Sequence, residues 1–288
     1  MIYRLLHFFI LLPFSYLPFF VLYFIADILY LFLYYVISYR KDVISKNISN
    51  SFGHLDPIER KKISKEFYKH LSDIMVESIK SFTITKNQLR KRFVIINPEI
   101  VDHYAQKNQS VIIVGGHYNN WEMFAQATPL YHQHKCLGIY KPLSNEFYNN
   151  KMLSSRQKFG FTMFSMKETI SCFKHPSIKA IFFASDQSPS NFKNVYWTTF
   201  LNQKTPVQYG VERLSKLYNY PIFSYHITKT KRGCFEAEYE LLCENPTATK
   251  KDEITELFTK KIESSILNKP EFWLWSHKRW KTNKYINN

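Results

Sequence analysis

The feature that most constrains this chain is a long apolar segment near its start that carries almost no charge. Between Leu5 and Tyr39 there is no Lys or Arg, and Asp27 is the only formally charged residue. As one straight helix this segment would be longer than the hydrocarbon core of a bilayer, which is about 30 Å thick. Pro13 and Pro18 are expected to divide it, because proline interrupts helical hydrogen bonding. We therefore predict one spanning or deeply embedded helix over residues 15–37.

Two other interpretations of this segment are weaker. A hydrophobic hairpin buried in a soluble core would have the same composition. A cleaved signal peptide fits poorly, because the apolar run is too long and lacks a small-residue exit site. Basic residues are more frequent after the segment (Arg40, Lys41, Lys46) than before it (Arg4). The positive-inside rule then places the rest of the chain in the cytoplasm. Together with the apolar segment, this predicts a membrane anchor over residues 1–40 followed by a domain over residues 41–288.

The remainder of the chain alternates short β-rich runs with stretches of helical length. A long helix is expected over residues 56–82, because Asp56 and Pro57 form an N-cap and first-position pair before apolar residues at helical spacing. Strands are expected at 93–96, 111–114, 137–140, 180–184, 222–227 and 235–242, and helices near 99–107, 121–131, 145–159, 207–219 and 252–267. This alternation predicts an α/β domain whose mixed, mainly parallel sheet is flanked by helices.

Composition restricts the partners and excludes some kinds of site. The net charge of +16 favours an anionic partner, which includes nucleic acid, an anionic membrane or an acidic carrier protein. The aromatic residues are not interleaved with basic ones in one stripe, which argues against nucleic acid. Seven glycines without a GxGxxG or Walker pattern exclude a glycine-rich phosphate loop. The four cysteines form no CxxC pair or metal-spaced cluster, so we interpret them as buried or idle thiols in a reducing compartment, the minor alternative being a nucleophilic cysteine.

The most informative stretch is the strand expected at 111–114 and the residues after it. Gly115 and Gly116 follow the strand, where small residues let the chain turn sharply and a substrate approach closely. His117 comes next, at the carboxyl edge of the sheet, where open α/β sheets bind their ligands. The position of this histidine indicates a catalytic or binding role.

A carboxylate lies five residues beyond the histidine. Asn119 or Asn120 can cap the following helix, which puts Glu122 in its first turn. A turn between His117 and Glu122 brings the two side chains together, although they would face apart on one continuous helix. A neutral imidazole can then take the proton of an attacking hydroxyl, and the carboxylate can fix its tautomer. The alternative is a histidine that ends a strand and a glutamate that decorates a helix terminus.

The H-x4-[DE] spacing is not specific by itself. Ten histidines should give roughly one such match by chance, and the chain contains a second one, His54 with Glu59. That second pair lies in a polar loop and a helix start with no strand before it. We interpret His54 and Glu59 as the chance match.

Several blocks along the chain resemble, in the same order, those of the lipid A biosynthesis (lauroyl or myristoyl) acyltransferases of the lysophospholipid acyltransferase superfamily. The matching positions are Arg40, Val43, Asn47 and Glu77; Gly116, His117, Asn120, Trp121 and Glu122; Arg156 and Gly160; Asp186 and Gln187; Phe200, Thr205, Pro206 and Gly210; and Trp275, His277, Lys278, Arg279, Trp280 and Lys281. The blocks extend over nearly the whole chain. Leu201 and Lys278 depart from the family's common Gly and Arg, which bears on the acyl chain and the acceptor and not on the reaction class.

The resemblance implies catalytic roles for His117 as general base and Glu122 as its orienting partner. Arg156 resembles a basic residue of the family that would bind a substrate phosphate or stabilise the thioester oxyanion. A surface salt bridge is the plainer interpretation of that arginine.

Further residues are expected around the same site. Asp186 ends the strand expected at 180–184, at the sheet edge where His117 should lie, and would act through substrate contact or loop hydrogen bonds. The resemblance also suggests Gln187 and Asn120 as substrate-binding residues. Residues 275–281 form an aromatic and basic cluster suited to an anionic lipid headgroup, the alternative being a core segment near the end of the fold.

The function implied by the resemblance is acyl transfer from a thioester, with acyl carrier protein as donor, to a hydroxyl of a lipid A precursor at the cytoplasmic face of the inner membrane. Donor, acceptor and membrane are negative, which suits a positive protein. A thioester is already activated, so no metal or organic cofactor is expected. The alternatives are an aminolipid or glycolipid acceptor, and a non-catalytic basic protein that binds membranes.

Overall fold

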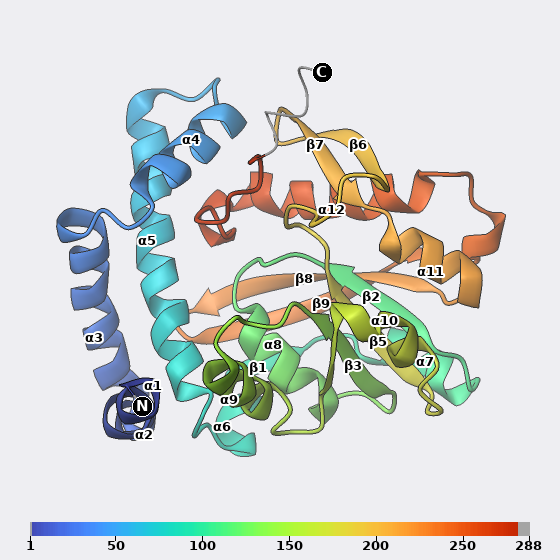
Figure 1. Ribbon diagram of the computed structural model, residues 1–288, viewed down its shortest axis with the longest axis horizontal. Helices are drawn as coiled ribbons and strands as arrows, with labels where there is room; N and C mark the ends of the chain where they lie inside the picture. The colour runs from blue at the N-terminus through green and yellow to red at the C-terminus, as the bar shows by residue number, and fades with distance from the viewer. Residues whose placement is uncertain (1, 282–288) are drawn as a thin grey trace.

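The computed structural model describes residues 2–281 and is built around one seven-stranded sheet (Figure 1). The strand order is β1-β9-β8-β2-β5-β3-β4, and neighbouring strands are parallel in every pair except β8 with β9. The strands are β1 Phe93–Ile95, β2 Val111–Gly115, β3 Lys135–Tyr140, β4 Thr162–Ser165, β5 Lys179–Ala184, β8 Ile222–Lys231 and β9 Cys234–Cys243. The predicted mixed, mainly parallel sheet is confirmed.

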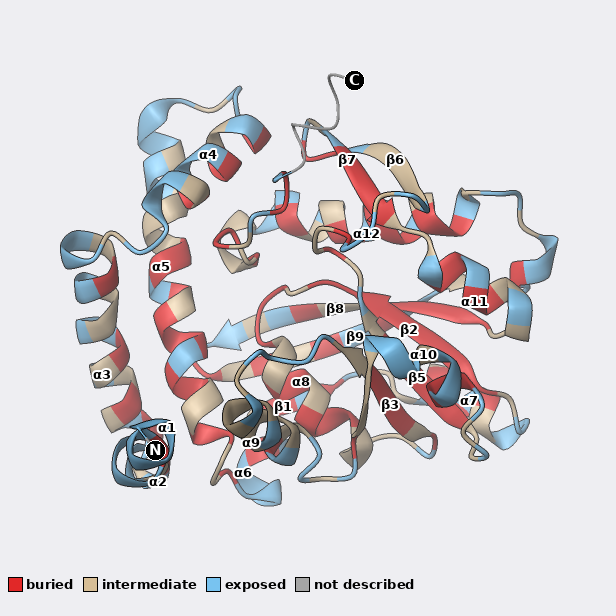
Figure 2. Ribbon diagram, viewed as in Figure 1, coloured by how far each residue is buried: buried red, intermediate tan, exposed pale blue. Residues whose placement is uncertain are grey.

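Helices cover both faces of the sheet. Strand β2 is fully buried and sends Ile112 and Val114 into one core and Val111 and Ile113 into the other. The first core is closed by α4 Lys41–Ser51, α5 Pro57–Lys80, α10 Thr169–Phe173, α11 Gly210–Tyr218 and α12 Glu253–Asn268. The second is closed by α6 Lys86–Arg90, α7 Glu99–Gln106 and α8 Trp121–Ala127, and α9 Glu146–Arg156 packs beside α8. Buried residues concentrate on the strands and on the inner helix faces (Figure 2).

Helix α5 is the longest helix of the fold and confirms the helix predicted over residues 56–82. The Asp56 side chain accepts hydrogen bonds from the backbone N–H groups of Ile58 and Glu59, and the Glu59 carboxylate accepts one from the Asp56 N–H. This reciprocal capping satisfies amide groups that the first helical turn would leave unpaired. The helix packs against α3, α4 and α8.

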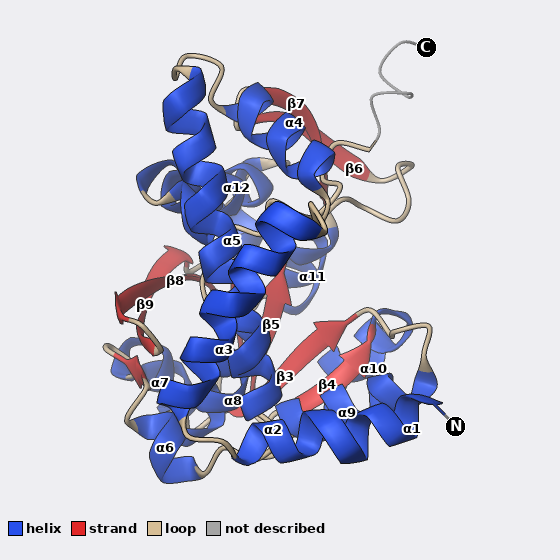
Figure 3. Cartoon of the chain, turned by 90° about the vertical axis from the view of Figure 1, so that its left-hand side faces the viewer, coloured by secondary structure: helices blue, strands red, loops and turns tan. Residues whose placement is uncertain are grey.

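The apolar N-terminal segment forms two helical stretches that lie against α5 and α9 (Figure 3). The first runs continuously over residues 2–16 as α1 Ile2–Leu6, a π-helical turn His7–Leu11 and α2 Leu12–Tyr16. The second is α3 Phe19–Leu31 with a π-helical turn Phe32–Val36. Pro18 divides the two, as predicted. The prediction that Pro13 also divides the segment is wrong. Pro13 follows the π-helical turn and lies in the first turn of α2, a position where a proline, which has no N–H to donate, is tolerated.

The second stretch, Phe19–Val36, is long and apolar enough to cross a membrane by length and composition. Only 22% of that window is buried, so the alternative of a hairpin hidden in a soluble core does not fit the structure. Large apolar side chains are exposed on its outer face, namely Phe20, Phe24, Ile28, Leu31, Phe32 and Tyr35. Its inner face packs on α5 through Leu22 and Ala26.

A separate two-stranded sheet was not predicted. Strands β6 Val195–Phe200 and β7 Gln203–Gln208 pair antiparallel beside α12. Strand β6 consists of Val, Tyr, Trp, Thr and Phe, which are typical strand residues, so its sequence carried a signal that the prediction missed. Strand β7 is rich in Gln, Lys and Thr and contains Pro206, so it has no clear strand pattern. The helix predicted over 207–219 therefore begins only at Gly210.

Candidate active site

The candidate site lies in the turn between β2 and α8. Strand β2 ends at Gly115, and α8 begins at Trp121. Asn119 takes a left-handed conformation (φ 57°), which asparagine tolerates better than most residues. Asn120 caps α8, since its side-chain oxygen accepts a hydrogen bond from the backbone N–H of Met123 at 2.8 Å. Of the two capping residues left open by the sequence, the structure uses Asn120.

Both glycines before His117 lie against closely packed side chains. A Cβ atom on Gly115 would lie 2.4 Å from ring atoms of Tyr225, and one on Gly116 would lie 3.0 Å from Oδ2 of Asp186. The Tyr225 hydroxyl donates to the carbonyl of Gly116 at 3.1 Å. The glycines thus let a tyrosine ring and a carboxylate press against the backbone that leads to His117.

Asp186 holds His117 at two points. The Nδ1 atom of His117 lies 2.7 Å from Oδ1 of Asp186, and the backbone N–H of His117 donates to Oδ2 at 2.8 Å. Asp186 reaches this position because it follows β5, which is parallel to β2 with Ala184 opposite Gly115. The contact fixes the Nδ1–H tautomer, and Nε2 makes no hydrogen bond to the part of the chain that the structure describes.

Trp273 is a third member of this group, and the sequence did not indicate it. Its indole N–H donates to Oδ2 of Asp186 at 2.8 Å, and the residue pairs with Tyr118 in an isolated β-bridge. Burial would raise the pKa of Asp186, but the charge of His117 and the hydrogen bonds from His117 and Trp273 lower it to about 2. The carboxylate is therefore ionised at neutral pH although it is buried.

Glu122 has a different partner from the one expected. We predicted that it orients His117, but its carboxylate is bound by Arg156, whose Nε donates to Oε2 at 2.7 Å and whose Nη2 donates to Oε1. The physical reason is that Asp186 already occupies Nδ1 of the imidazole, whereas the end of α9 brings a guanidinium against the first turn of α8. The orienting role assigned to Glu122 is corrected: the structure gives that position to Asp186.

The Glu122–Arg156 pair nevertheless borders His117. Burial would raise the pKa of Glu122, but the charge and hydrogen bonds of Arg156 and a smaller contribution from His117 hold it below its usual value. The Arg156 side chain is 24% exposed, and its Nη1 makes no hydrogen bond within residues 2–281. Arg156 is thus half-buried in a bidentate pair and is not a surface salt bridge.

Two residues expected to bind substrate lie differently. Asn120 is buried, and both ends of its amide are engaged, the oxygen by Met123 and the nitrogen by Oε2 of Glu77 at 2.6 Å. These contacts give Asn120 a structural role at the helix start, and its role in substrate binding stays a prediction. Gln187 is half-buried next to Asp186 and has no hydrogen bond to the described residues, so its role in substrate binding stays a prediction.

The cluster at residues 275–281 is mostly inside the protein. Trp275 is 0% exposed and Arg279 1%, and the Asn47 amide donates to the carbonyls of Trp275 and His277. The expectation of a headgroup-binding surface there is wrong for these buried residues. The segment packs among Phe200, Trp273 and the β6–β7 hairpin because its aromatic rings complete the first core.

The second H-x4-[DE] pair has a structural explanation. His54 is exposed in the loop between α4 and α5, and Glu59 is the capping-box residue of α5. No hydrogen bond joins the two among the described residues. Within those residues there is also no group of three His, Cys, Asp or Glu side chains arranged to hold a metal ion.

A cavity of about 390 Å³ lies elsewhere, between Pro129, His134, Cys136 and Ile178. These residues precede β3 and β5 or start them, so the cavity is at the opposite end of the strands from His117. It shares no residue with the site.

The sequence is similar to known acyltransferases over most of its length. Residues 2–282 match the family described as bacterial lipid A biosynthesis acyltransferase. The chain is similar to the lipid A biosynthesis palmitoleoyltransferase of Escherichia coli (strain K12), with 22% identity over 251 residues, which cover 84% of this chain and 79% of the relative. The lipid A biosynthesis acyltransferase of Shigella flexneri matches to the same extent. The chain is an acyltransferase and belongs to the bacterial lipid A biosynthesis acyltransferase family.

Proposed function

We propose that this protein transfers a fatty acyl chain from an acyl thioester, carried by acyl carrier protein, to a hydroxyl of a lipid A precursor at the cytoplasmic face of the inner membrane. The family and the names of the two relatives support acyl transfer to lipid A. The net charge of +16 suits an acidic carrier and an anionic lipid.

The observation that carries the proposal is the state of His117. Its Nδ1 is bound to the ionised Asp186, and its Nε2, which makes no hydrogen bond to the described residues, can accept a proton. A histidine held in this way is a general base whose conjugate acid is stabilised by the neighbouring carboxylate. The His117 side chain is 21% exposed, so a substrate hydroxyl can reach it.

The reaction follows from these positions. Nε2 of His117 takes the proton of the acceptor hydroxyl, whose oxygen attacks the thioester carbonyl carbon and forms the new ester bond. The C–S bond breaks as the tetrahedral intermediate collapses, and the imidazolium returns the proton to the departing sulfur. Arg156, whose Nη1 makes no hydrogen bond within residues 2–281 and whose orientation is fixed by Glu122, would stabilise the oxyanion or a substrate phosphate.

The membrane position rests on the N-terminal helices. The outer face of the Phe19–Val36 stretch is apolar and exposed, and so are Ile2, Leu5 and Phe9 of the first stretch. Such surfaces are stable when they are covered by lipid acyl chains. The basic residues that follow at Arg40, Lys41 and Lys46 support a cytoplasmic location of the domain.

The test is a transfer assay with the purified full chain in anionic phospholipid vesicles, supplied with acyl carrier protein loaded with acyl chains of several lengths. Mass spectrometry should show a lipid A precursor that gains one acyl group. The His117→Ala variant should lose about 10²–10⁴-fold in rate, because it lacks the general base. His54→Ala is the control, because His54 belongs to the second H-x4-[DE] match and lies outside the site, and this variant should keep the wild-type rate. Acylation of aminolipids with no change in the lipid A precursor would replace the proposed acceptor.

A further inference from the structure

Helix α3 presents one ordered stripe to the rest of the protein. Phe19, Tyr23 and Asp27 are spaced four residues apart and so lie on one face of the helix. Asp27 is the only formal charge in the apolar segment, and Tyr23 and Asp27 both face polar groups of other elements. This polar side contrasts with the apolar outer face of the same helix.

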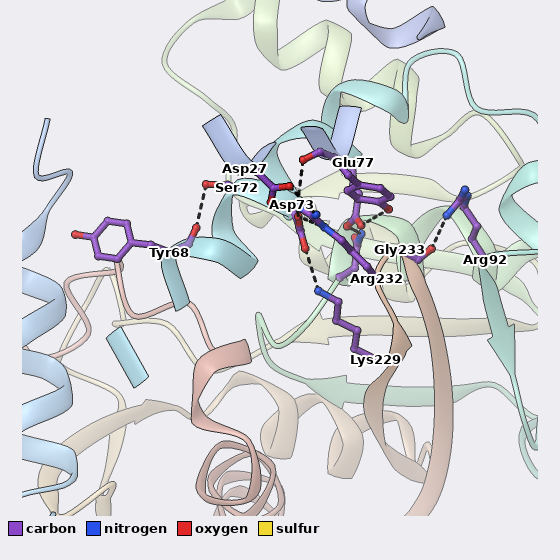
Figure 4. Close-up of polar contacts among 11 residues, drawn as sticks. Asp27, Tyr68, Ser72, Asp73, Glu77, Arg92, Lys229, Arg232 and Gly233 are labelled. Atoms are coloured by element: carbon purple, nitrogen blue, oxygen red, sulfur yellow. Dashed lines mark hydrogen bonds and ion pairs between the residues drawn. The ribbon is translucent and has the colours of Figure 1, made fainter. Parts of the chain in front are cut away.

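The outer end of the stripe is held by the turn between β8 and β9. Arg232 donates to Asp27 at 2.6 Å and to Asp73 of α5 at 2.7 Å, and Lys229 donates to Asp73 at 3.0 Å. Figure 4 shows the carboxylates of Asp27 and Asp73 directed toward these two basic side chains. Next to them, Arg92 lies over the Phe19 ring with 3.3 Å between its guanidinium carbon and the ring centroid.

Tyr23 joins the stripe to the interior. Its hydroxyl donates to Oε1 of Glu77 at 2.8 Å, and Glu77 is only 2% exposed. Gly233 leaves the necessary space, because a Cβ atom there would collide with the Tyr23 hydroxyl. The tyrosine is therefore fixed on both sides, by a buried carboxylate and by a glycine turn.

The other oxygen of Glu77 contacts the start of the catalytic helix. Oε2 accepts the Asn120 amide hydrogen at 2.6 Å, while the Asn120 oxygen accepts from the backbone N–H of Met123 at 2.8 Å. Glu122 lies between those two residues in the first turn of α8. The hydrogen bonds thus form one chain, Tyr23–Glu77–Asn120, that ends on the turn carrying Glu122.

We propose that Tyr23 and Glu77 are positioning residues of the acyltransferase site, so that the membrane-facing helix α3 is also a structural part of that site. The proposal rests on the proposed function insofar as the β2–α8 turn is the catalytic one. Removing one of these hydrogen bonds leaves a buried amide or carboxylate without its partner, which costs free energy. The unpaired group lowers this cost by moving to a new partner or to water. A displacement of about 1 Å at a reacting group can lower the rate by about 100-fold.

A purely stabilising role for the same bonds makes a different prediction. It expects lower thermal stability with unchanged turnover by the molecules that remain folded. A positioning role expects the opposite pattern, a fall in kcat per folded molecule with little change in KM.

The cleanest test uses two asparagine caps. Asn120→Ser keeps an N-cap oxygen for α8 but removes the amide that reaches Glu77, because serine is an equally good cap with a shorter side chain. Asn145 caps α9 in the same way, accepting from the Tyr148 N–H at 3.0 Å, and its amide nitrogen has no hydrogen bond to the described residues. We expect kcat to fall at least 10-fold in Asn120→Ser, with KM within about twofold, and to stay at the wild-type value in Asn145→Ser.

Variants of Glu77 and Tyr23 test the other hydrogen bonds of the series Tyr23–Glu77–Asn120. In Glu77→Gln the amide oxygen can accept from Asn120 and the amide nitrogen can donate to the Tyr23 oxygen, so activity should remain within a few-fold of wild type. Glu77→Leu removes both hydrogen bonds and Tyr23→Phe removes the one between Tyr23 and Glu77, so both variants should lose kcat. Asp27→Asn weakens the ion pair with Arg232 but leaves the hydrogen bonds of Tyr23, Glu77 and Asn120 in place, so the full-length variant should retain activity.

A second measurement does not depend on turnover. Amide hydrogen exchange at Met123, the residue bound by the Asn120 cap, should become faster in Glu77→Leu and Tyr23→Phe and remain slow in Asp27→Asn. The proposal would be overturned if Asn120→Ser kept the wild-type kcat, or if Asn120→Ser and Asn145→Ser lost kcat equally. Unchanged exchange at Met123 in Glu77→Leu and Tyr23→Phe would also overturn it. If the wild-type chain fails to acylate a lipid A precursor, the proposed function is wrong, and the exchange data still decide whether α3 holds the turn.

Discussion

Asp186 binds His117 through both of its carboxylate oxygens, one at the imidazole Nδ1 and one at the backbone N–H of the same residue. A single side chain thus fixes the tautomer of the base and the position of its backbone. This arrangement separates the site into two pairs, His117 with Asp186 and Glu122 with Arg156. The pairs should respond differently to substitution.

Asp186→Asn should reduce the rate of acyl transfer by about 10³–10⁴-fold while the protein stays folded. The asparagine keeps the size of the side chain, but its amide can donate to Nδ1 and stabilise the wrong tautomer. Initial rates with a saturating acyl thioester measure the effect. Asp102→Asn is the control, because Asp102 is also buried and lies 3.1 Å from a histidine, His132, outside the site. A comparable loss in that control would mean that the effect is one of folding.

Double variants should show two independent couplings. Once His117 is removed, Asp186 has nothing to orient, so His117→Ala with Asp186→Asn should be about as slow as His117→Ala alone. For the other pair the coupling should appear in the melting temperature. Glu122→Gln and Arg156→Gln each leave a partly buried charge unpaired, and the double variant should melt no lower than the worse single one. Fully additive losses within both pairs would contradict this division.

Trp273→Phe should lower kcat by about 10-fold, since it removes the one indole hydrogen bond to Asp186, which is worth about 1.5 kcal/mol when the acceptor is charged. Trp275→Phe is the matched control. It also loses an indole hydrogen bond, to the carbonyl of Pro270, but that bond does not touch the site. Both variants should lose some stability, and only the first should lose turnover. Equal effects on kcat would show that Trp273 acts by packing alone.

The free energy of unfolding should fall with rising pH because of Glu77. Burial, with a smaller contribution from Asp73, raises the pKa of this carboxyl to about 7, so the folded state holds its proton more tightly than the unfolded chain. Its contribution is therefore complete below the unfolded value near 4.5 and is lost as pH rises toward 7. Glu77→Gln cannot titrate, so the stability of wild type relative to this variant should fall by up to about 3 kcal/mol between pH 4 and pH 8. Denaturant unfolding in micelles at a series of pH values measures the difference between the two proteins.

Much of this fold could be predicted because its strands and helices have strong local patterns. The strand at Val111–Gly115 is a continuous apolar run between turn residues, and the helix at Pro57–Lys80 begins with a capping box. In the β6–β7 hairpin, β6 has a run of β-branched and aromatic residues that was overlooked, whereas β7, with Gln, Lys and Pro206, has no such pattern. Their stability comes from packing against α12 and the segment around Trp280, which a local pattern does not contain.

The candidate site was predictable in part for the same reason. His117 and Asp186 could both be placed at the carboxyl edge of the sheet, but which carboxylate binds the imidazole depends on β5 lying next to β2. Strand order is a property of the folded chain, so the five-residue spacing to Glu122 suggested the wrong partner. Trp273 was missed because it reaches the site from after α12, and the aromatic residues around it gave no sign of whether they lie inside or outside.

Because Trp273 contacts Asp186, the order in which the ribosome makes these two residues determines when the site is completed. Trp273 is translated 87 residues after Asp186, so a ribosome-bound chain can form β2, β5 and the His117–Asp186 contact while the indole is still unmade. The His117–Asp186 pair and the indole that completes the site are thus made at different times. Proteolysis between Asn268 and Trp273 would return a mature molecule to that unfinished condition without cutting any strand of the sheet.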